Sequence, residues 1–279
     1  MQFIPLGLSL AFAAALVPPL VGAIRRAGLT RPNYRGRAAV SPAGVVVVGV
    51  SLATVAGLML LDRLSADLLV PPALGPAVVF VVGVALLGLV DDLRGGAGPR
   101  GVRGHLRTAA AGRFSTGVLK GAGTLALALL TASNGALAGA DAGLAEILVA
   151  AAVLTLSAHV FNLLDLRPGR SVKALALLGL GLSAASLELA PLWVLGAFLG
   201  PLVVLAPLDL RERTMLGDTG AATVGALAGL WIVLALPLLG QAGALVLLVL
   251  AATYGEFRSI SVLIERTPLL RGLDSLGRS

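Results

Sequence analysis

Cysteine is absent from this sequence, and histidine, aromatic and charged residues are scarce. Without cysteine the chain has no disulfide, no thiolate nucleophile and no zinc-thiolate site, and its redox compartment stays undetermined. Charged residues make up only 13% of the sequence and apolar residues 57%, whereas soluble globular domains carry about 25% charged residues. This composition excludes an ordinary soluble protein and indicates an integral membrane protein.

Apolar segments long enough to cross the roughly 30 Å hydrocarbon core of a bilayer recur along the whole chain. They predict an all-α, polytopic membrane helix bundle of about nine transmembrane helices, with ten as the alternative, in one integral membrane domain over 1–279. The fourth and sixth segments are short. The predicted spans are 3–24, 42–61, 73–90, 117–132, 143–160, 172–187, 191–208, 219–238 and 242–263.

The positive charges are distributed very unevenly between the two sides of this predicted bundle. A first span that lacks a preceding basic segment and is followed by Arg25 and Arg26 is typical of a retained helix rather than a cleaved signal peptide. With the N-terminus outside and the C-terminus inside, all of the 21 lysines and arginines except Arg63 fall on the inner side. This asymmetry follows the positive-inside rule and predicts a multi-pass membrane protein with its basic connections in the cytoplasm. We therefore interpret the net charge of +7 as a topology signal rather than as a sign of nucleic-acid binding.

Acidic and amide side chains stand beside the inner ends of three predicted spans. Asp91 and Asp92 follow the third span, Asn162 and Asp165 follow the fifth, and Asp218 precedes the eighth. An ionised Asp at the bilayer centre costs about 2.5–3.5 kcal/mol on insertion scales, so acids at membrane depth need a specific reason to be kept. All five residues are predicted to lie on the cytoplasmic face.

These residue types suit a metal ion and phosphate groups. Magnesium prefers oxygen ligands, and it commonly takes one or two from the protein and others from substrate phosphates. Neighbouring cations could neutralise a diphosphate; the candidates are Arg94, Arg167, Arg170 and Lys173, together with Lys120. The pattern favours metal-assisted phosphoryl transfer at a membrane surface.

Each group also has a structural interpretation. The Asp91–Asp92 pair could simply form ion pairs with nearby arginines at the membrane interface. The residues after the fifth span could form a helix end and a Pro-Gly turn, Asp218 could cap the eighth span, and Lys120 could extend its amine to the interface. Only the coincidence of all three groups on one face favours function.

Three motifs in this order resemble the polyprenyl-phosphate N-acetylhexosamine-1-phosphate transferases, glycosyltransferase family 4, which includes the phospho-N-acetylmuramoyl-pentapeptide transferase. The motifs are Gly88–Asp92, Asn162–Gly169 and Leu216–Gly220, and the resemblance extends from about Pro32 to the ninth span. It implies transfer of a sugar 1-phosphate from a UDP-sugar to polyprenyl phosphate, which yields a polyprenyl-diphospho-sugar and UMP for cell-envelope glycan synthesis. Members of the family often form homodimers, and the resemblance implies a multi-pass protein of the plasma (inner) membrane with its active site on the cytoplasmic face.

The resemblance also implies roles for individual residues. Asp91 and Asp92 would engage or activate the lipid phosphate, and Lys120 would bind the diphosphate. Asn162 and Asp218 would hold Mg²⁺, with Mn²⁺ as an alternative, and Asp165 would line the nucleotide pocket.

The chain departs from the family pattern at two places. In the middle motif, Leu166 and Pro168 stand where the family has Gly and Asp, and the segment 265–278 lacks the family's histidine-rich motif. These departures leave the donor sugar open. They also leave open a non-catalytic family member that acts as a lipid-binding or assembly partner. A membrane transporter is a further alternative, because charged residues at membrane depth often mark transport pathways.

Overall fold

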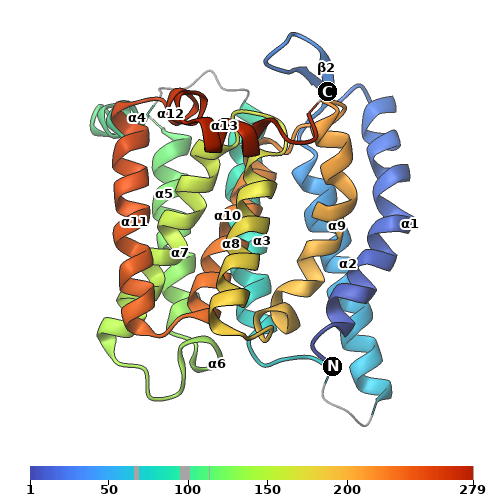
Figure 1. Ribbon diagram of the computed structural model, residues 1–279, viewed down its shortest axis with the longest axis vertical. Coiled ribbons are helices and arrows are strands. Elements are labelled where there is room, and N and C mark those ends of the chain that lie inside the picture. Colours follow the sequence, from blue (N-terminus) through green and yellow to red (C-terminus); the bar gives the residue numbers. More distant parts are fainter. Residues whose placement is uncertain (66–68, 95–100, 113, 279) are drawn as a thin grey trace.

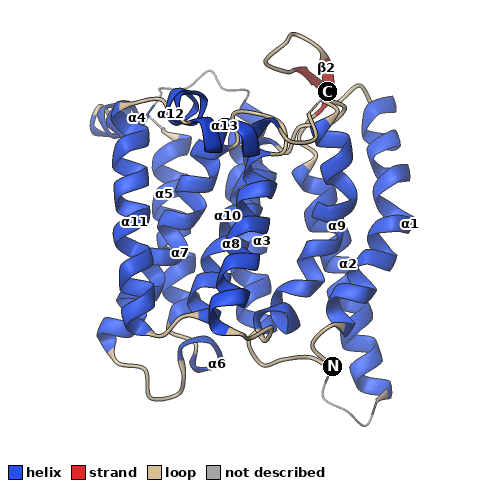
Figure 2. Cartoon of the chain, in the orientation of Figure 1, coloured by secondary structure: helices blue, strands red, loops and turns tan. Residues whose placement is uncertain are grey.

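The computed structural model describes residues 1–65, 69–94, 101–112 and 114–278. Within these ranges the chain is almost entirely helical, with one small hairpin (Figures 1 and 2). The strands β1 (Thr30–Pro32) and β2 (Ala38–Val40) pair antiparallel. The helices are α1 (Ile4–Arg26), α2 (Gly44–Leu64), α3 (Leu74–Arg94), α4 (Gly101–Ala110), α5 (Thr116–Ala132), α6 (Gly135–Ala138), α7 (Leu144–Leu164), α8 (Arg170–Ser186), α9 (Pro191–Leu210), α10 (Gly217–Ala235), α11 (Leu238–Phe257), α12 (Ile260–Arg266) and α13 (Pro268–Ser275).

The predicted polytopic membrane helix bundle is confirmed in its coarse form. Seven of the described helices are long and apolar enough to cross a membrane, namely α1, α2, α3, α7, α9, α10 and α11. The short fourth and sixth predicted spans correspond to α5 and α8, which have 17 residues each. The bundle therefore contains seven clear candidate spans and two shorter helices that run alongside them (Figure 1).

Helix α10 is the central element of the bundle. Every residue from Thr219 to Val233 is buried, whereas α11 at the edge of the bundle has no buried residue. The α10 sequence is rich in glycine and alanine, and small residues let membrane helices approach closely. At Gly225 an added Cβ would lie 2.7 Å from the Cα of Ala158 on α7. The small residues thus place the start of α10 next to the ends of its neighbours.

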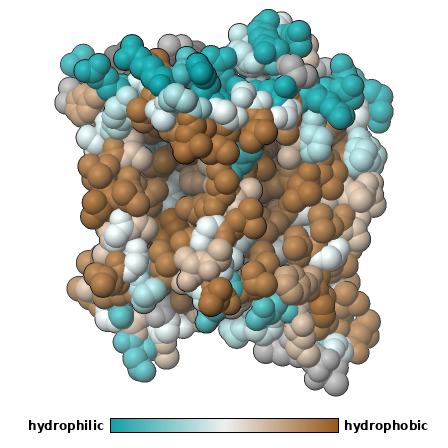
Figure 3. Space-filling model, in the orientation of Figure 1, coloured by the Kyte–Doolittle hydropathy of each residue, from teal (hydrophilic) through white to brown (hydrophobic). Residues whose placement is uncertain are grey.

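The segments predicted to be cytoplasmic gather at one end of the molecule. The hairpin, α4, α12 and α13 lie at this end, and α6 and the N-terminus lie at the other (Figure 1). Figure 3 shows hydrophilic residues along this end and an apolar belt across the middle. We call it the polar end. Arg100 and Arg113, which belong to the predicted basic loops, lie outside the described residues.

Three helices end at places that the predicted spans did not indicate. Helix α3 continues through Asp91 and Asp92, and α7 continues past Asn162, so these polar residues lie in final helical turns rather than in loops. The last predicted span, 242–263, is divided, because α11 ends at Phe257 and α12 begins at Ile260. Apolar length alone does not reveal such ends, since a helix can continue into the polar interface without a change in its backbone hydrogen bonds.

The long predicted inner loop also contains a helix, α4, that hydropathy did not indicate. His105 lies on α4, and its Nδ1 is 2.8 Å from the hydroxyl of Ser115. The same hydroxyl accepts the Val118 amide and caps α5. This contact fixes the beginning of the helix that carries Lys120.

Candidate functional site

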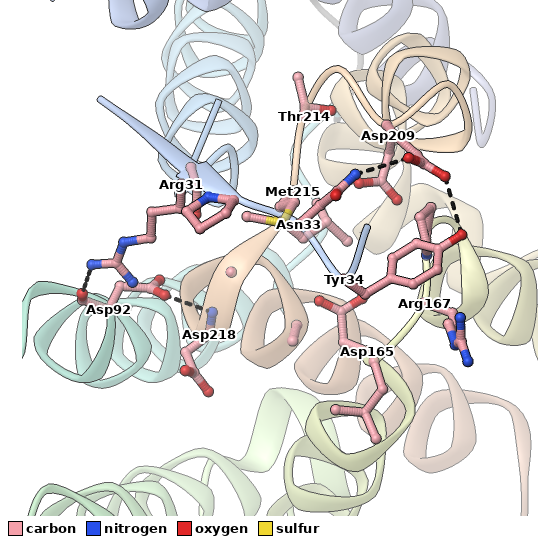
Figure 4. A pocket seen from close by; sticks show the side chains of 18 of the residues that line it. Arg31, Asn33, Tyr34, Asp92, Asp165, Arg167, Asp209, Thr214, Met215 and Asp218 are labelled. Atoms are coloured by element: carbon pink, nitrogen blue, oxygen red, sulfur yellow. Dashed lines mark hydrogen bonds between the residues drawn. The ribbon is translucent and has the colours of Figure 1, made fainter. Parts of the chain in front are cut away.

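A cavity of about 420 Å³ opens at the polar end, between the hairpin, the ends of α3 and α7, and the start of α10 (Figure 4). Figure 4 shows Arg31, Asp92 and Asp218 on one side of the cavity, and Tyr34 and Arg167 on the other. The cavity lining includes the predicted site residues Asp92, Asn162, Asp165, Arg167 and Asp218. The three sequence motifs therefore meet in one place.

Asp92 caps the beginning of α10. Its Oδ1 accepts the backbone amide of Asp218 at 3.0 Å, and its Oδ2 accepts the amide and hydroxyl of Thr219 at 2.8 and 2.6 Å. The first residues of a helix have amides without helical partners, and a carboxylate there also meets the positive end of the helix dipole. The N-cap residue of α10, Leu216, supplies no side-chain cap. The capping role considered for Asp218 is thus performed by Asp92, a residue on another helix.

Two glycines make this cap possible. Gly217 has φ +70°, the left-handed region that glycine adopts at little cost. At Gly88 an added Cβ would lie 2.4 Å from the backbone oxygen of Asp218. Glycines at these positions therefore allow α3 to approach α10 closely enough for Asp92, which is only 4% exposed, to reach the helix start.

Lys120 on α5 lies at the centre of the other polar residues. Its Nζ donates to Asp218 Oδ1 at 2.7 Å and to Asn162 Oδ1 at 3.1 Å, and it lies 3.9 Å from Asp91 Oδ2. Residues from α3, α7 and α10 thus converge on the ammonium group of α5. Asp91 and Asp92, adjacent in sequence, have different environments: Asp91 faces Lys120, and Asp92 faces the backbone of α10.

The oxygens around Lys120 fit the donor type that magnesium prefers. They come from two carboxylates and one amide, and a magnesium site commonly adds water and substrate phosphate oxygens to such a partial set. Across the described ranges no three acidic or histidine side chains form a group that could hold a metal ion. A metal here would therefore depend on ligands from the substrate. Asn162 and Asp218, the predicted metal ligands, and Asp91 are the residues that could hold it.

Asp165 lines the cavity just after the end of α7. The residue keeps some exposed surface, but its carboxyl group is enclosed and accepts the Ser171 hydroxyl at 2.6 Å. Burial, followed by the nearby charge of Asp209, raises the pKa of Asp165 to about 7, although the Ser171 hydrogen bond opposes the rise. Asp165 therefore holds a proton over much of the range in which an ordinary aspartate is ionised.

Asp209, which sequence analysis did not single out, positions the turn after Asp165. Its Oδ2 accepts the amide of Gly169 at 2.6 Å, and Gly169 has φ +69°. An added Cβ at Gly169 would lie 2.5 Å from Leu210. The Pro168–Gly169 turn thus begins α8 against the end of α9.

Glu212, also missed by sequence analysis, anchors the hairpin above the cavity. The side chain is buried, and it accepts Asn33 Nδ2 at 2.9 Å and the Tyr34 hydroxyl at 3.1 Å. It also pairs with Arg35 at 3.0 Å and with Arg37 at 3.7 Å. Acidic residues carry little weight in the positive-inside rule, and no local sequence pattern distinguished Glu212 from other loop residues.

Tyr34 joins the hairpin to the predicted substrate-binding residue Arg167. The Arg167 guanidinium lies 4.5 Å from the centre of the Tyr34 ring, within the range of a cation–π contact. Arg167 also pairs with Glu265 at 3.1 Å. Arg31 lines the opposite side of the cavity and donates to the backbone oxygen of Asp92.

The other three predicted substrate-binding cations do not line this cavity. Arg170 forms a bidentate ion pair with Asp274, at 2.8 and 3.0 Å, and bonds to Ser261. Lys173 donates to backbone oxygens at the end of α13, and Arg94 stacks on Phe114. Arg170 and Lys173 therefore hold the α12–α13 segment against the start of α8.

Comparisons with known protein families and with curated proteins find no match for this chain.

Proposed function

We propose that the protein transfers a sugar 1-phosphate from a UDP-sugar, such as a UDP-N-acetylhexosamine, to polyprenyl phosphate. The observation that carries the proposal is the convergence of Asp91, Asn162 and Asp218 on Lys120 beside a cavity. The order and spacing of the three sequence motifs also resemble those of the polyprenyl-phosphate N-acetylhexosamine-1-phosphate transferases, which catalyse this reaction. Four polar residues from four helices gathered beside a cavity are the arrangement expected for a catalytic site.

In the proposed reaction an oxygen of the polyprenyl phosphate forms a bond to the β-phosphorus of the donor. The bond between this phosphorus and the oxygen that bridges to the α-phosphorus breaks, and UMP leaves with the bridging oxygen. Bound Mg²⁺ would supply charge neutralisation at the diphosphate. Lys120 would neutralise phosphate oxygens close to the metal, since its ammonium lies beside Asn162 and Asp218, the candidate metal ligands.

The two adjacent aspartates take different roles in this proposal. Both carboxylate oxygens of Asp92 already accept hydrogen bonds from α10, so we assign it a positioning role. Asp91 keeps 28% of its side chain exposed and faces Lys120. Asp91 is therefore the better candidate to orient the acceptor phosphate or to accept its proton.

The charge pattern supports a cytoplasmic location for the site. The cavity lies at the polar end, where the basic connections gather, and the positive-inside rule assigns that end to the cytoplasm. A water-soluble UDP-sugar would then enter from the cytoplasm, and the lipid acceptor from the adjacent leaflet. On this account α5 and α8 span the membrane with the seven longer helices.

The proposal is tested by UMP release from purified protein supplied with Mg²⁺, undecaprenyl phosphate and a panel of UDP-sugars. We expect release from wild type and none from Asp218→Ala. Asp141→Asn, at an exposed residue in the connection between α6 and α7, serves as the control and should retain activity. A correctly folded wild type that releases no UMP above the Asp218→Ala background with any donor would favour the non-catalytic alternative.

A further inference from the structure

A second cavity, of about 540 Å³, lies between the hairpin and the α12–α13 segment. It is formed by parts of the chain that are far apart in the sequence, since the hairpin belongs to the first 40 residues and α13 begins at Pro268. The residues that line it are Tyr34, Arg35, Arg167, Glu265, Arg271, Asp274, Ser275 and Arg278.

The lining of this second cavity carries excess positive charge. It includes four arginines and two acids. Both acids are already paired, Glu265 with Arg167, and Asp274 with Arg170 and Arg278. These two hydrogen bonds outweigh the effect of burial and lower the pKa of Asp274 to about 2, so it remains ionised. The lining arginines thus exceed the lining acids even with every acid charged, although Arg35 is itself paired with Glu212 outside the lining.

Arg271 has the least compensated of these charges. The described part of the chain places no acidic side chain in an ion pair with it, and the residue is exposed. A guanidinium group with free donors can bind a carboxylate through two parallel hydrogen bonds. The second cavity is therefore suited to an anion.

The two cavities are adjacent, because Tyr34 and Arg167 line both of them. A ligand with its diphosphate near Asn162 and Asp218, which line the first cavity, could extend past the stacked Tyr34 and Arg167 into the second cavity. The hairpin projects beyond the ends of the long helices (Figure 1), so this extension leads toward water. A soluble molecule fits this direction better than a lipid headgroup does.

We propose that the second cavity binds a carboxylate on the sugar of the donor, so that the preferred substrate is an acidic UDP-sugar. This inference rests on the proposed function. The uridine end of the donor carries no charge beyond its phosphates, so only the sugar end can present a further anion to the arginines. Selectivity for the donor then comes from charge complementarity between the sugar and the α12–α13 segment.

The test compares the affinity of the protein for three ligands by calorimetry: UDP, UDP-N-acetylglucosamine, and the same donor with C6 oxidised to a carboxylate. We expect the acid to bind about tenfold more tightly than the neutral sugar, the gain typical of one charge-assisted contact. Arg271→Gln should remove this difference and leave the affinity for UDP unchanged. Arg266→Gln is the matched control, because Arg266 is exposed on α12 but does not line the cavity.

The outcomes separate this inference from the proposed function. If UDP binds and the acidic and neutral donors have equal affinity, the inference is overturned and the proposed function stands. The same conclusion holds if the acid is preferred equally by wild type and Arg271→Gln. If UDP itself does not bind, the proposed function fails and this inference fails with it.

Discussion

The carboxylate of Asp92 on α3 accepts both the amide and the hydroxyl of Thr219 on α10, at 2.8 and 2.6 Å. Two helices that are more than 120 residues apart in the sequence are thereby joined at their ends. This contact places the neighbouring Asp91 and Asp218 on either side of Lys120. A structural aspartate thus sets the positions of the residues that we assign to chemistry.

Asp92→Ala should destabilise the protein, and Asp91→Ala should not. The first change leaves the buried amide and hydroxyl of Thr219 and the partly buried amide of Asp218 without an acceptor, and an unsatisfied buried polar group costs about 1–3 kcal/mol. The second removes a partly exposed carboxylate 3.9 Å from Lys120. Thermal unfolding of the two variants in the same detergent measures the difference. Equal melting temperatures would refute the division of roles between the two acids.

Gly88→Ala should also be destabilising, by about 1–3 kcal/mol, because the new methyl group would meet the backbone of Asp218 rather than a movable side chain. Gly121→Ala on α5 is the control, since nothing lies within 4 Å of an added Cβ there. A helical alanine is favoured over glycine by about 1 kcal/mol, so the control should be neutral or stabilising. A melting temperature of Gly88→Ala equal to or above that of Gly121→Ala would contradict the close approach of α3 to α10.

The sequence was sufficient to predict the membrane bundle, because hydropathy depends on the number of consecutive apolar residues rather than on contacts. The sequence also predicted that Asp91, Asn162 and Asp218 lie on one side of the membrane, because the positive charges indicate which connections are on the inner side. It could not separate Asp91 from Asp92, because which carboxylate faces α10 depends on the rotation of α3. Glu212 and Asp209 were missed for a similar reason: their partners, in the hairpin and at Gly169, are more than 35 residues away.

The stability of the protein should depend on pH through Asp165. In the unfolded chain the carboxyl group of Asp165 loses its proton near pH 3.8, but in the folded protein it keeps this proton until about pH 7. Stability therefore falls as pH rises through this window and levels off above it. Asp165→Asn mimics the protonated form, so the melting temperature of this variant should rise relative to that of wild type as the pH increases from 5 to 8. Parallel profiles for the two proteins would show that Asp165 is ionised throughout.

Arg170→Gln should release the α12–α13 segment from α8. The change removes the bidentate pair with Asp274 and the bond to Ser261, and loss of one partner from a buried ion pair costs up to about 3–5 kcal/mol. Limited proteolysis should then cut within 259–278 faster than in wild type. Arg94→Gln, an exposed arginine at the same end of the molecule, is the control. An unchanged cleavage rate would show that the ion pair does not hold this segment.

The fate of the donor's β-phosphate tests the central claim most directly. Protein supplied with Mg²⁺, undecaprenyl phosphate and a UDP-sugar radiolabelled at the β-phosphate should place the label in the lipid fraction and release unlabelled UMP. Lys120→Met should reduce this transfer at least about a hundredfold, the loss typical of a group that stabilises transition-state charge. Label that remains in UDP while the sugar enters the lipid, or transfer that is unaffected by Lys120→Met, would contradict sugar 1-phosphate transfer at the Lys120 site.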